Sequence, residues 1–198
     1  MLRKLTQNHD LAMRLTWLRI FIIVPLIGTL YIPEHIIHPG TRNLILCLLF
    51  SIASITDALD GYLARKFCMT TDLGALLDTI ADKLLVCSAL VILLSLGRID
   101  PIIAIIIIGR EITITALRQW MSASGASNSV KVNWHGKAKA IAQMIAITFL
   151  LYHDCLLGID IKTIGTVLIW IATALTIHSM VVYFISAISY TRKKQHLE

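Results

Sequence analysis

Six long apolar stretches recur along the chain, and they constrain its fold more than any other feature. Each reaches roughly the 20 residues that a helix needs to cross the roughly 30 Å of hydrocarbon in a bilayer. Hydrophobic residues make up 57% of the sequence and charged residues only 15%, a balance too apolar for a soluble domain of this length to cover with polar surface. We therefore predict an all-α integral membrane fold with six transmembrane helices, at about residues 17–33, 41–63, 74–96, 101–120, 138–157 and 163–189.

The sequence shows no internal repeat or low-complexity linker, so we expect a single membrane domain over residues 1–198. Residues 1–15 would form a cytoplasmic N-terminal segment, in which Leu2, Leu5 and Leu11 suit a short helix along the membrane surface. The six membrane helices would occupy about residues 16–189, and residues 190–198 would form a cytoplasmic tail.

Lysines and arginines are distributed unequally between the two sides of these spans. One side holds 12 of them, whereas the other holds Arg42, Arg98 and Lys162. By the positive-inside rule the first side is cytoplasmic, so both termini face the cytoplasm, and we expect a bacterial cytoplasmic membrane protein. The formal net charge of +6 is explained by contacts with anionic membrane lipids and phosphorylated substrates, and no nucleic acid is expected as a partner.

Four aspartates interrupt the second and third apolar stretches, namely Asp57, Asp60, Asp78 and Asp82. Ionisable groups are costly at membrane depth and therefore indicate a functional site. The first two lie three residues apart and the last two lie four apart, so each pair shares one helix face. Converging carboxylates repel one another unless a cation balances them, and all-oxygen sites suit Mg²⁺ or Mn²⁺. We expect two metal ions bridged by these side chains.

Small residues and one arginine accompany the aspartates. Gly61 follows Asp60 directly and Gly74 precedes Asp78 by one turn, and without side chains both let a ligand or a neighbouring helix approach. Arg65 is placed to meet a phosphate. Simpler interpretations exist for each part, because Asp-x2-Asp-Gly also occurs in turns and helix caps, and single membrane aspartates occur in proton or ion carriers. The fixed gaps between all the positions argue against chance.

The full pattern is Asp57-x2-Asp60-Gly61-x2-Ala64-Arg65-x8-Gly74-x3-Asp78-x3-Asp82. In this stretch the chain resembles the CDP-alcohol phosphotransferases, whose defining motif it matches at every position. The resemblance implies a six-helix membrane enzyme, usually a homodimer, with two metal ions at the cytoplasmic end of its helices. It also implies the reaction, in which an alcohol hydroxyl attacks a phosphorus of a CDP-linked substrate and CMP leaves.

The resemblance also implies a role for each residue of the pattern. Asp82 would be the general base that takes the proton from the incoming hydroxyl. The metal ligands would be the four aspartates, Asp57, Asp60, Asp78 and Asp82. The CDP moiety would be bound by Asp57, Asp60, Gly61, Arg65 and Gly74. Metal ions that bridge the diphosphate would neutralise charge on the leaving phosphate.

A second set of charged residues lies in IIGREITITALRQW, inside the fourth apolar stretch. Glu111 and Arg118 are seven residues apart on one helix stripe, so the acid can orient the base there. An internal ion pair that only locks helices together is the alternative interpretation. In VKVNWHGKAKAIAQ, Lys137 and Lys139 begin the fifth stretch, where several cations could hold a phosphate monoester. For these lysines the alternative is ordinary basic flanking of a membrane helix.

Together the two segments resemble the members of the family that transfer a phosphatidyl group from CDP-diacylglycerol to glycerol 3-phosphate. These members show an REI-x4-LR stretch, matched by residues 110–118, and a GK-x-K-x3-Q stretch, matched by residues 136–143. LTWLR, which contains Thr16 and Arg19, resembles the start of their first helix. The resemblance implies that the acceptor phosphate is bound by Arg110, Arg118, Lys137 and Lys139, with Glu111 supporting Arg118.

The chain departs from these members at three places, and other functions stay open. Thr79, Ala140 and the pair 12–13 stand where proline, threonine and Pro-Asn are common. Cardiolipin, phosphatidylinositol phosphate and phosphatidylserine synthases share the aspartate motif, and only the acceptor pocket separates them from this chain. Outside the enzyme class, an ion or proton transporter could use the same buried acids and bases. Such a transporter explains Gly61, Ala64 and Arg65 poorly.

Overall fold

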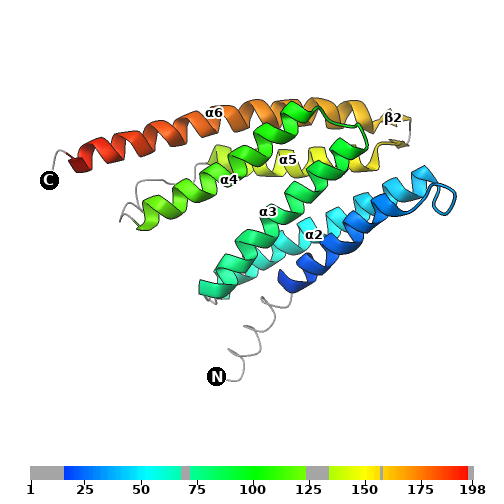
Figure 1. The fold of residues 1–198 in the computed structure, drawn as a ribbon, viewed down its shortest axis with the longest axis horizontal. Coiled ribbons are helices and arrows are strands. Elements are labelled where there is room, and N and C mark those ends of the chain that lie inside the picture. Colours follow the sequence, from blue (N-terminus) through cyan, green and yellow to red (C-terminus); the bar gives the residue numbers. More distant parts are fainter. Residues whose placement is uncertain (1–15, 68–71, 124–133, 157, 196–198) are drawn as a thin grey trace, which may run out of the picture. The chain divides into compact units, whose positions relative to one another are not determined.

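The computed structural model describes residues 16–67, 72–123, 134–156 and 158–195, which Figure 1 follows from blue to red. Within these residues the predicted, mostly helical architecture is confirmed. A helix over residues 16–28 continues into the 3₁₀ helix η1. The other elements are η1 Thr29–Tyr31, α2 Pro39–Phe67, α3 Asp72–Ser95, α4 Pro101–Ala123, α5 Trp134–Tyr152, β1 Cys155–Leu156, β2 Ile159–Asp160 and α6 Ile161–Gln195. The surface helix expected within residues 1–15 lies outside the described residues.

Several helix ends follow directly from their sequence. α2 and α4 both begin at a proline, whose missing N–H is no loss in the first turn of a helix. Asp100 caps α4, because its Oδ1 accepts a 2.8 Å hydrogen bond from the backbone N–H of Ile102. α3 ends where Gly97 adopts a φ of 64°, a left-handed conformation that costs glycine little. This turn is closed by a 2.9 Å hydrogen bond from the N–H of Arg98 to the carbonyl of Leu93.

The chain forms two compact units. The first comprises residues 1–98 and 147–162, and the second comprises residues 99–146 and 163–198. In the first unit, α2 and α3 pack together, with Leu46, Phe50 and Ala53 buried on α2 at helical spacing. In the second unit, Ile103 and Ile107 are buried one turn apart on α4. Each helix therefore buries one apolar stripe.

Large apolar side chains also cover the outer faces of the helices. On α2 alone, Leu44, Leu48, Ile52 and Ile55 are 46 to 60% exposed. Among the described residues, the segments Pro39–Ala58 and Ile161–Ile185 are long and apolar enough to cross a bilayer, and only 22% of each is buried. α3 and α4 carry more charged residues, and the apolar helix Thr16–Tyr31 and the described apolar part of α5, Ala140–Tyr152, are shorter. The predicted count of six spans therefore stays a prediction.

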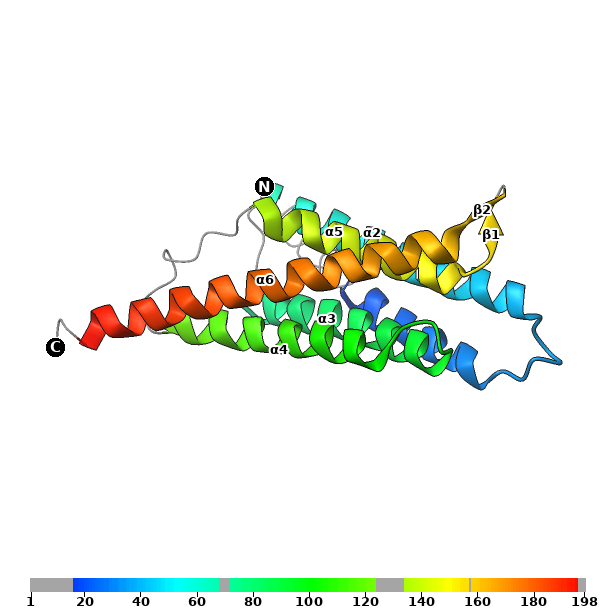
Figure 2. The same ribbon diagram turned by 90° about the horizontal axis from the view of Figure 1, so that it is seen from above.

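α6 is the longest element, with 35 residues in one continuous helix (Figure 2). At 1.5 Å per residue it is about 50 Å long, more than the roughly 30 Å of a hydrocarbon core. The antiparallel hairpin that precedes α6 pairs Cys155 with Asp160 and Leu156 with Ile159. β1 occupies the end of the predicted fifth span and β2 lies beyond it, so the all-α prediction is corrected by one short hairpin.

A polar network holds the first unit together where α2 begins and α3 ends. Arg98 donates hydrogen bonds of 3.0 and 2.7 Å to the carbonyls of Leu150 and Leu151, at the C-terminal end of α5. The same guanidinium donates to Oδ1 of Asn43, whose amide donates a 3.1 Å hydrogen bond to Asp154. These contacts fix the start of α2 against the end of α5.

Candidate active site

Arg19 joins Asp57 and Asp78 in the first unit. Its Nη2 lies 2.8 Å from Oδ1 of Asp57 on α2, and its Nη1 donates a 3.0 Å hydrogen bond to Oδ1 of Asp78 on α3. The arginine side chain is completely buried, whereas the two carboxylates are 29% and 44% exposed. Three helices therefore converge on one charged cluster, and its acidic members remain open to their surroundings.

Asp82 lies one turn after Asp78 on α3 and extends this cluster. The charges of Asp78 and Asp82 both act on Asp57, so three of the four predicted carboxylates lie near one another. Oδ2 of Asp82 is 3.2 Å from Nζ of the adjacent Lys83, and both side chains are 30% exposed. A ligand can therefore reach the carboxylate that the sequence marks as the general base.

For some residues of the predicted site the structure describes the backbone alone, namely Asp60, Gly61, Ala64, Arg65, Lys137 and Lys139. Their backbone places the first four on α2 and the two lysines on α5. Gly74 lies on α3, one turn before Asp78. Among the residues that are described, no group of three or more His, Cys, Asp or Glu side chains has the spacing of a metal site.

The chemistry of this donor set nevertheless fits a hard divalent cation. Asp57, Asp78 and Asp82 offer carboxylate oxygens, the ligands that Mg²⁺ and Mn²⁺ prefer. The guanidinium of Arg19 lies within ion-pair distance of both Asp57 and Asp78, so these two carboxylates already share one positive charge. The residues present therefore fit a metal site.

A second charged group lies in the other unit, on α4. Nη1 of Arg110 is 2.6 Å from Oε1 of Glu111, and both side chains are 12% exposed. The hydroxyl of Thr115 donates a 2.7 Å hydrogen bond to the backbone carbonyl of Glu111. The ion pair is therefore internal to α4, between two residues that are adjacent in sequence.

Arg118, two turns after Glu111 on α4, contacts α6. Its Nη2 donates a 2.8 Å hydrogen bond to the hydroxyl of Tyr183, and its guanidinium carbon lies 5.2 Å from the centroid of the tyrosine ring. Gln143, which ends the GK-x-K-x3-Q stretch, is buried on α5. The support of Arg118 by Glu111 stays a prediction, whereas its contact with Tyr183 is observed.

The sequence did not point to two of these contacts. Arg19 was visible as part of LTWLR and as a base inside an apolar stretch, which indicates that an acid is near but not which one. Tyr183 gave no signal, because tyrosine near the end of an apolar helix is an ordinary interfacial residue. Arg19 and Asp78 are 59 residues apart, and Arg118 and Tyr183 are 65 apart. Only the fold could bring them together.

Comparisons with known proteins agree with the aspartate pattern. Residues 9–178 match the family model described as CDP-alcohol phosphatidyltransferase. A Haemophilus influenzae protein named CDP-diacylglycerol--glycerol-3-phosphate 3-phosphatidyltransferase is 40% identical over 178 residues, which cover 89% of this chain and 92% of the relative. Relatives of the same name from Salmonella choleraesuis and Shigella flexneri serotype 5b are 38% and 40% identical, over 87% and 71% of this chain and 92% and 76% of their own lengths.

The family match extends across most of the chain, including the helices that carry Arg19, Asp57 and Asp78. The resemblance predicted from the aspartate pattern is therefore confirmed. The chain belongs to the CDP-alcohol phosphatidyltransferase family.

Proposed function

We propose that this protein transfers the phosphatidyl group of CDP-diacylglycerol to sn-glycerol 3-phosphate and releases CMP, a step in phosphatidylglycerol biosynthesis. The observation that carries the proposal is the 40% identity to the Haemophilus influenzae relative, whose name states this activity, over 89% of the chain. The cluster of Asp57, Asp78 and Asp82 supports it, because displacement at a diphosphate requires negative charge to be held and neutralised.

In the proposed reaction, the 1-hydroxyl of glycerol 3-phosphate attacks the phosphorus that carries the diacylglycerol. A new P–O bond forms, the diphosphate P–O bond breaks, and CMP leaves. Asp82 takes the proton of the attacking hydroxyl. Gly61, Arg65 and Gly74, beside Asp57 and Asp60, line the CDP moiety. Two divalent metal ions, Mg²⁺ or Mn²⁺, bound by Asp57, Asp60, Asp78 and Asp82, would supply charge neutralisation on the leaving phosphate.

The acceptor phosphate is the second anionic group that the site must hold. We assign it to Arg110, Arg118, Lys137 and Lys139, with Glu111 in support. Arginines suit this task because a guanidinium binds phosphate oxygens in a bidentate manner. The ion pair of Arg110 with Glu111 would hold that arginine in place on α4.

The apolar helices and the family together indicate a membrane protein. We propose that residues 1–198 act as one membrane domain of six spans in a bacterial cytoplasmic membrane. Both termini and the aspartate cluster would face the cytoplasm, where glycerol 3-phosphate is dissolved. The resemblance to the family also favours a homodimer.

The test is CMP release by the purified protein in detergent, with CDP-diacylglycerol and Mg²⁺ or Mn²⁺. Glycerol 3-phosphate, inositol phosphate, serine and phosphatidylglycerol are compared as acceptors, and the lipid product is identified by mass. Release that depends on glycerol 3-phosphate and yields phosphatidylglycerophosphate is the expected result. Preference for another acceptor would keep the aspartate chemistry but overturn the acceptor assignment. Cation flux without CMP release would favour a transporter.

A further inference from the structure

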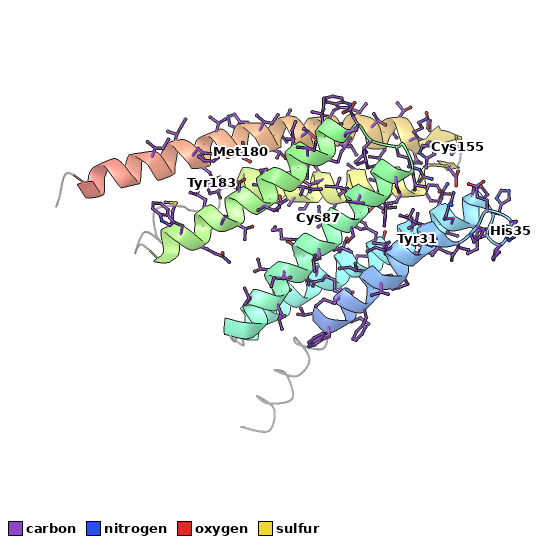
Figure 3. All side chains as sticks on the ribbon, viewed as in Figure 1. Tyr31, His35, Cys87, Cys155, Met180 and Tyr183 are labelled. Carbon is purple, nitrogen blue, oxygen red and sulfur yellow. The ribbon has the colours of Figure 1, made fainter. Side chains whose placement is uncertain are left out.

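The contact between Arg118 and Tyr183 suggests how the acceptor phosphate is held. Both residues lie in the second unit, Arg118 on α4 and Tyr183, which is labelled in Figure 3, on α6. The tyrosine hydroxyl accepts a 2.8 Å hydrogen bond from Nη2, and its ring lies under the guanidinium at 5.2 Å. Two different interactions therefore fix one exposed arginine side chain.

The two arginines of α4 differ in the partner that holds them. Arg110 is paired with the carboxylate of Glu111 at 2.6 Å, so much of its charge is compensated within the helix. Tyr183 is neutral and orients Arg118 without cancelling its charge. Among the described residues, Arg118 forms no ion pair, so its positive charge is available to an anionic ligand.

Arg118 also keeps most of its hydrogen-bonding capacity. A guanidinium carries five N–H donors, and the contact with Tyr183 uses one of them. The remaining donors can form the paired hydrogen bonds that arginine makes to phosphate oxygens. Ordering a long arginine side chain in advance lowers the entropy that binding would otherwise cost.

We propose that Tyr183 is a positioning residue that holds Arg118 in the orientation needed to bind the phosphate of the acceptor alcohol. This inference rests on the proposed function and identifies a residue that acts on the acceptor side only. If Tyr183 merely packed α6 against α4, its removal would change stability without separating the two substrates.

The first variant is Tyr183→Phe, which keeps the ring and removes the hydroxyl. The matched control is Tyr31→Phe, because Tyr31 is 82% exposed and lies in the first unit (Figure 3). We expect the KM for glycerol 3-phosphate to rise roughly three- to tenfold in Tyr183→Phe, as for one lost hydrogen bond of ordinary strength. The KM for CDP-diacylglycerol should stay within about twofold. The control should change neither constant.

A double-mutant cycle with Arg118→Gln tests whether Tyr183 acts through Arg118. Once Arg118 is replaced, Tyr183→Phe should raise the KM for glycerol 3-phosphate by no more than about twofold further. An undiminished effect in that background would overturn the inference, and so would an equal rise in both KM values together with a lower Tm. Arg118→Lys provides a second route, because lysine keeps the charge but loses the planar contact, and it should show the same selective rise.

These outcomes separate the inference from the proposed function. The wild-type protein could release CMP with glycerol 3-phosphate while Arg118→Gln leaves the KM for glycerol 3-phosphate unchanged. In that case the role of Tyr183 is overturned and the activity stands. If the wild-type protein gives no CMP with this acceptor, the proposed function itself fails.

Discussion

The helix pair α2 and α3 holds a different arginine at each of its two ends. Where α2 begins and α3 ends, Arg98 donates hydrogen bonds to neutral acceptors, whereas toward the other end Arg19 pairs with carboxylates. Arg98 donates to two backbone carbonyls and to the amide oxygen of Asn43, and these acceptors carry no charge that a ligand could use. Arg19 lies between Asp57 and Asp78, both of which are partly exposed. Asn43 and Asp57 are about 20 Å apart along α2 at 1.5 Å per residue.

The two ends of the helix pair therefore differ in whether their polar groups stabilise the fold or can bind a ligand. Hydrogen bonds from a half-buried arginine to the last carbonyls of a helix stabilise that helix end. Carboxylates that outnumber their nearby cations are poorly balanced and therefore suited to bind a cation. We infer that the Asn43–Arg98–Asp154 network holds the fold and that the Arg19–Asp57–Asp78 cluster, with Asp82, binds ligands.

The largest effect is expected for Asp82→Asn, which removes the proposed base. CMP release should fall by roughly a thousandfold, as when a general base is lost. The Tm should change little, because Asp82 is 30% exposed and its ion pair is with the adjacent Lys83. Asp100→Asn is the matched control, since asparagine caps a helix as well as aspartate does. Turnover by Asp82→Asn near the wild-type rate would remove Asp82 as the base.

Replacing Arg19 should be the next largest change, and its effect should depend on metal. Arg19→Gln leaves Asp57 and Asp78 without their buried cation, so we expect a loss of about 2 to 4 kcal/mol of stability in the presence of a chelator. Added Mg²⁺ or Mn²⁺ should restore part of this loss and raise the Tm more in the variant than in the wild type. An equal rise in both proteins would mean that Arg19 and the metal do not share these carboxylates.

At the opposite end, Arg98→Ala should affect stability without affecting chemistry. The substitution leaves the carbonyls of Leu150 and Leu151 and the side chain of Asn43 without their donor, which costs about 1 to 3 kcal/mol. Glu34→Ala is the control, because this glutamate is 71% exposed and pairs with Arg42 at 3.0 Å, and a solvent-exposed pair of this kind is worth about 0 to 1 kcal/mol. Folded Arg98→Ala should release CMP at the wild-type rate. A selective loss of turnover would break the distinction between the two ends.

The sequence predicted those features that follow from a regular period. The apolar stretches predicted the helices, and the three- and four-residue gaps placed Asp57 with Asp60 and Asp78 with Asp82 on shared helix faces. The fixed gaps between these residues also identified the family, which the match over residues 9–178 confirms. The roles of the individual residues stay predictions until variants are measured.

Features that depend on tertiary contacts could not be predicted in this way. A two-residue strand such as Cys155–Leu156 is too short to show a period, so this strand was counted as part of the fifth span. Likewise, Arg19 could have met any of several acids, and nothing near Tyr183 in the sequence indicates Arg118. Long-range partners of this kind are decided by how the helices pack.

His153 lies near the Asn43–Arg98–Asp154 network and should make the stability of that region depend on pH. The expected change in Tm is small. This histidine lies in the connection between α5 and β1, with a φ of 59°. Burial lowers the pKa of His153 below its ordinary value, and the charges of Arg98 and Lys162 lower it further, although Asp154 and Asp160 act in the opposite direction. The folded protein therefore prefers the neutral imidazole. The unfolded chain binds the proton first, at a pH of about 6.5.

The sign of the pH dependence follows from this preference. Above a pH of about 6.5 the imidazole is neutral in both states and stability does not depend on it. As the pH falls below that value, the unfolded state gains protons first, so stability decreases until the folded pKa is passed. His153→Asn removes the titrating group and keeps a residue that tolerates a positive φ, so its Tm should fall less between pH 7.5 and about pH 5.5. His35→Asn, at an exposed site (Figure 3), controls for the replacement of a histidine. Parallel Tm curves for the wild type and His153→Asn would show that folding does not lower the pKa of His153.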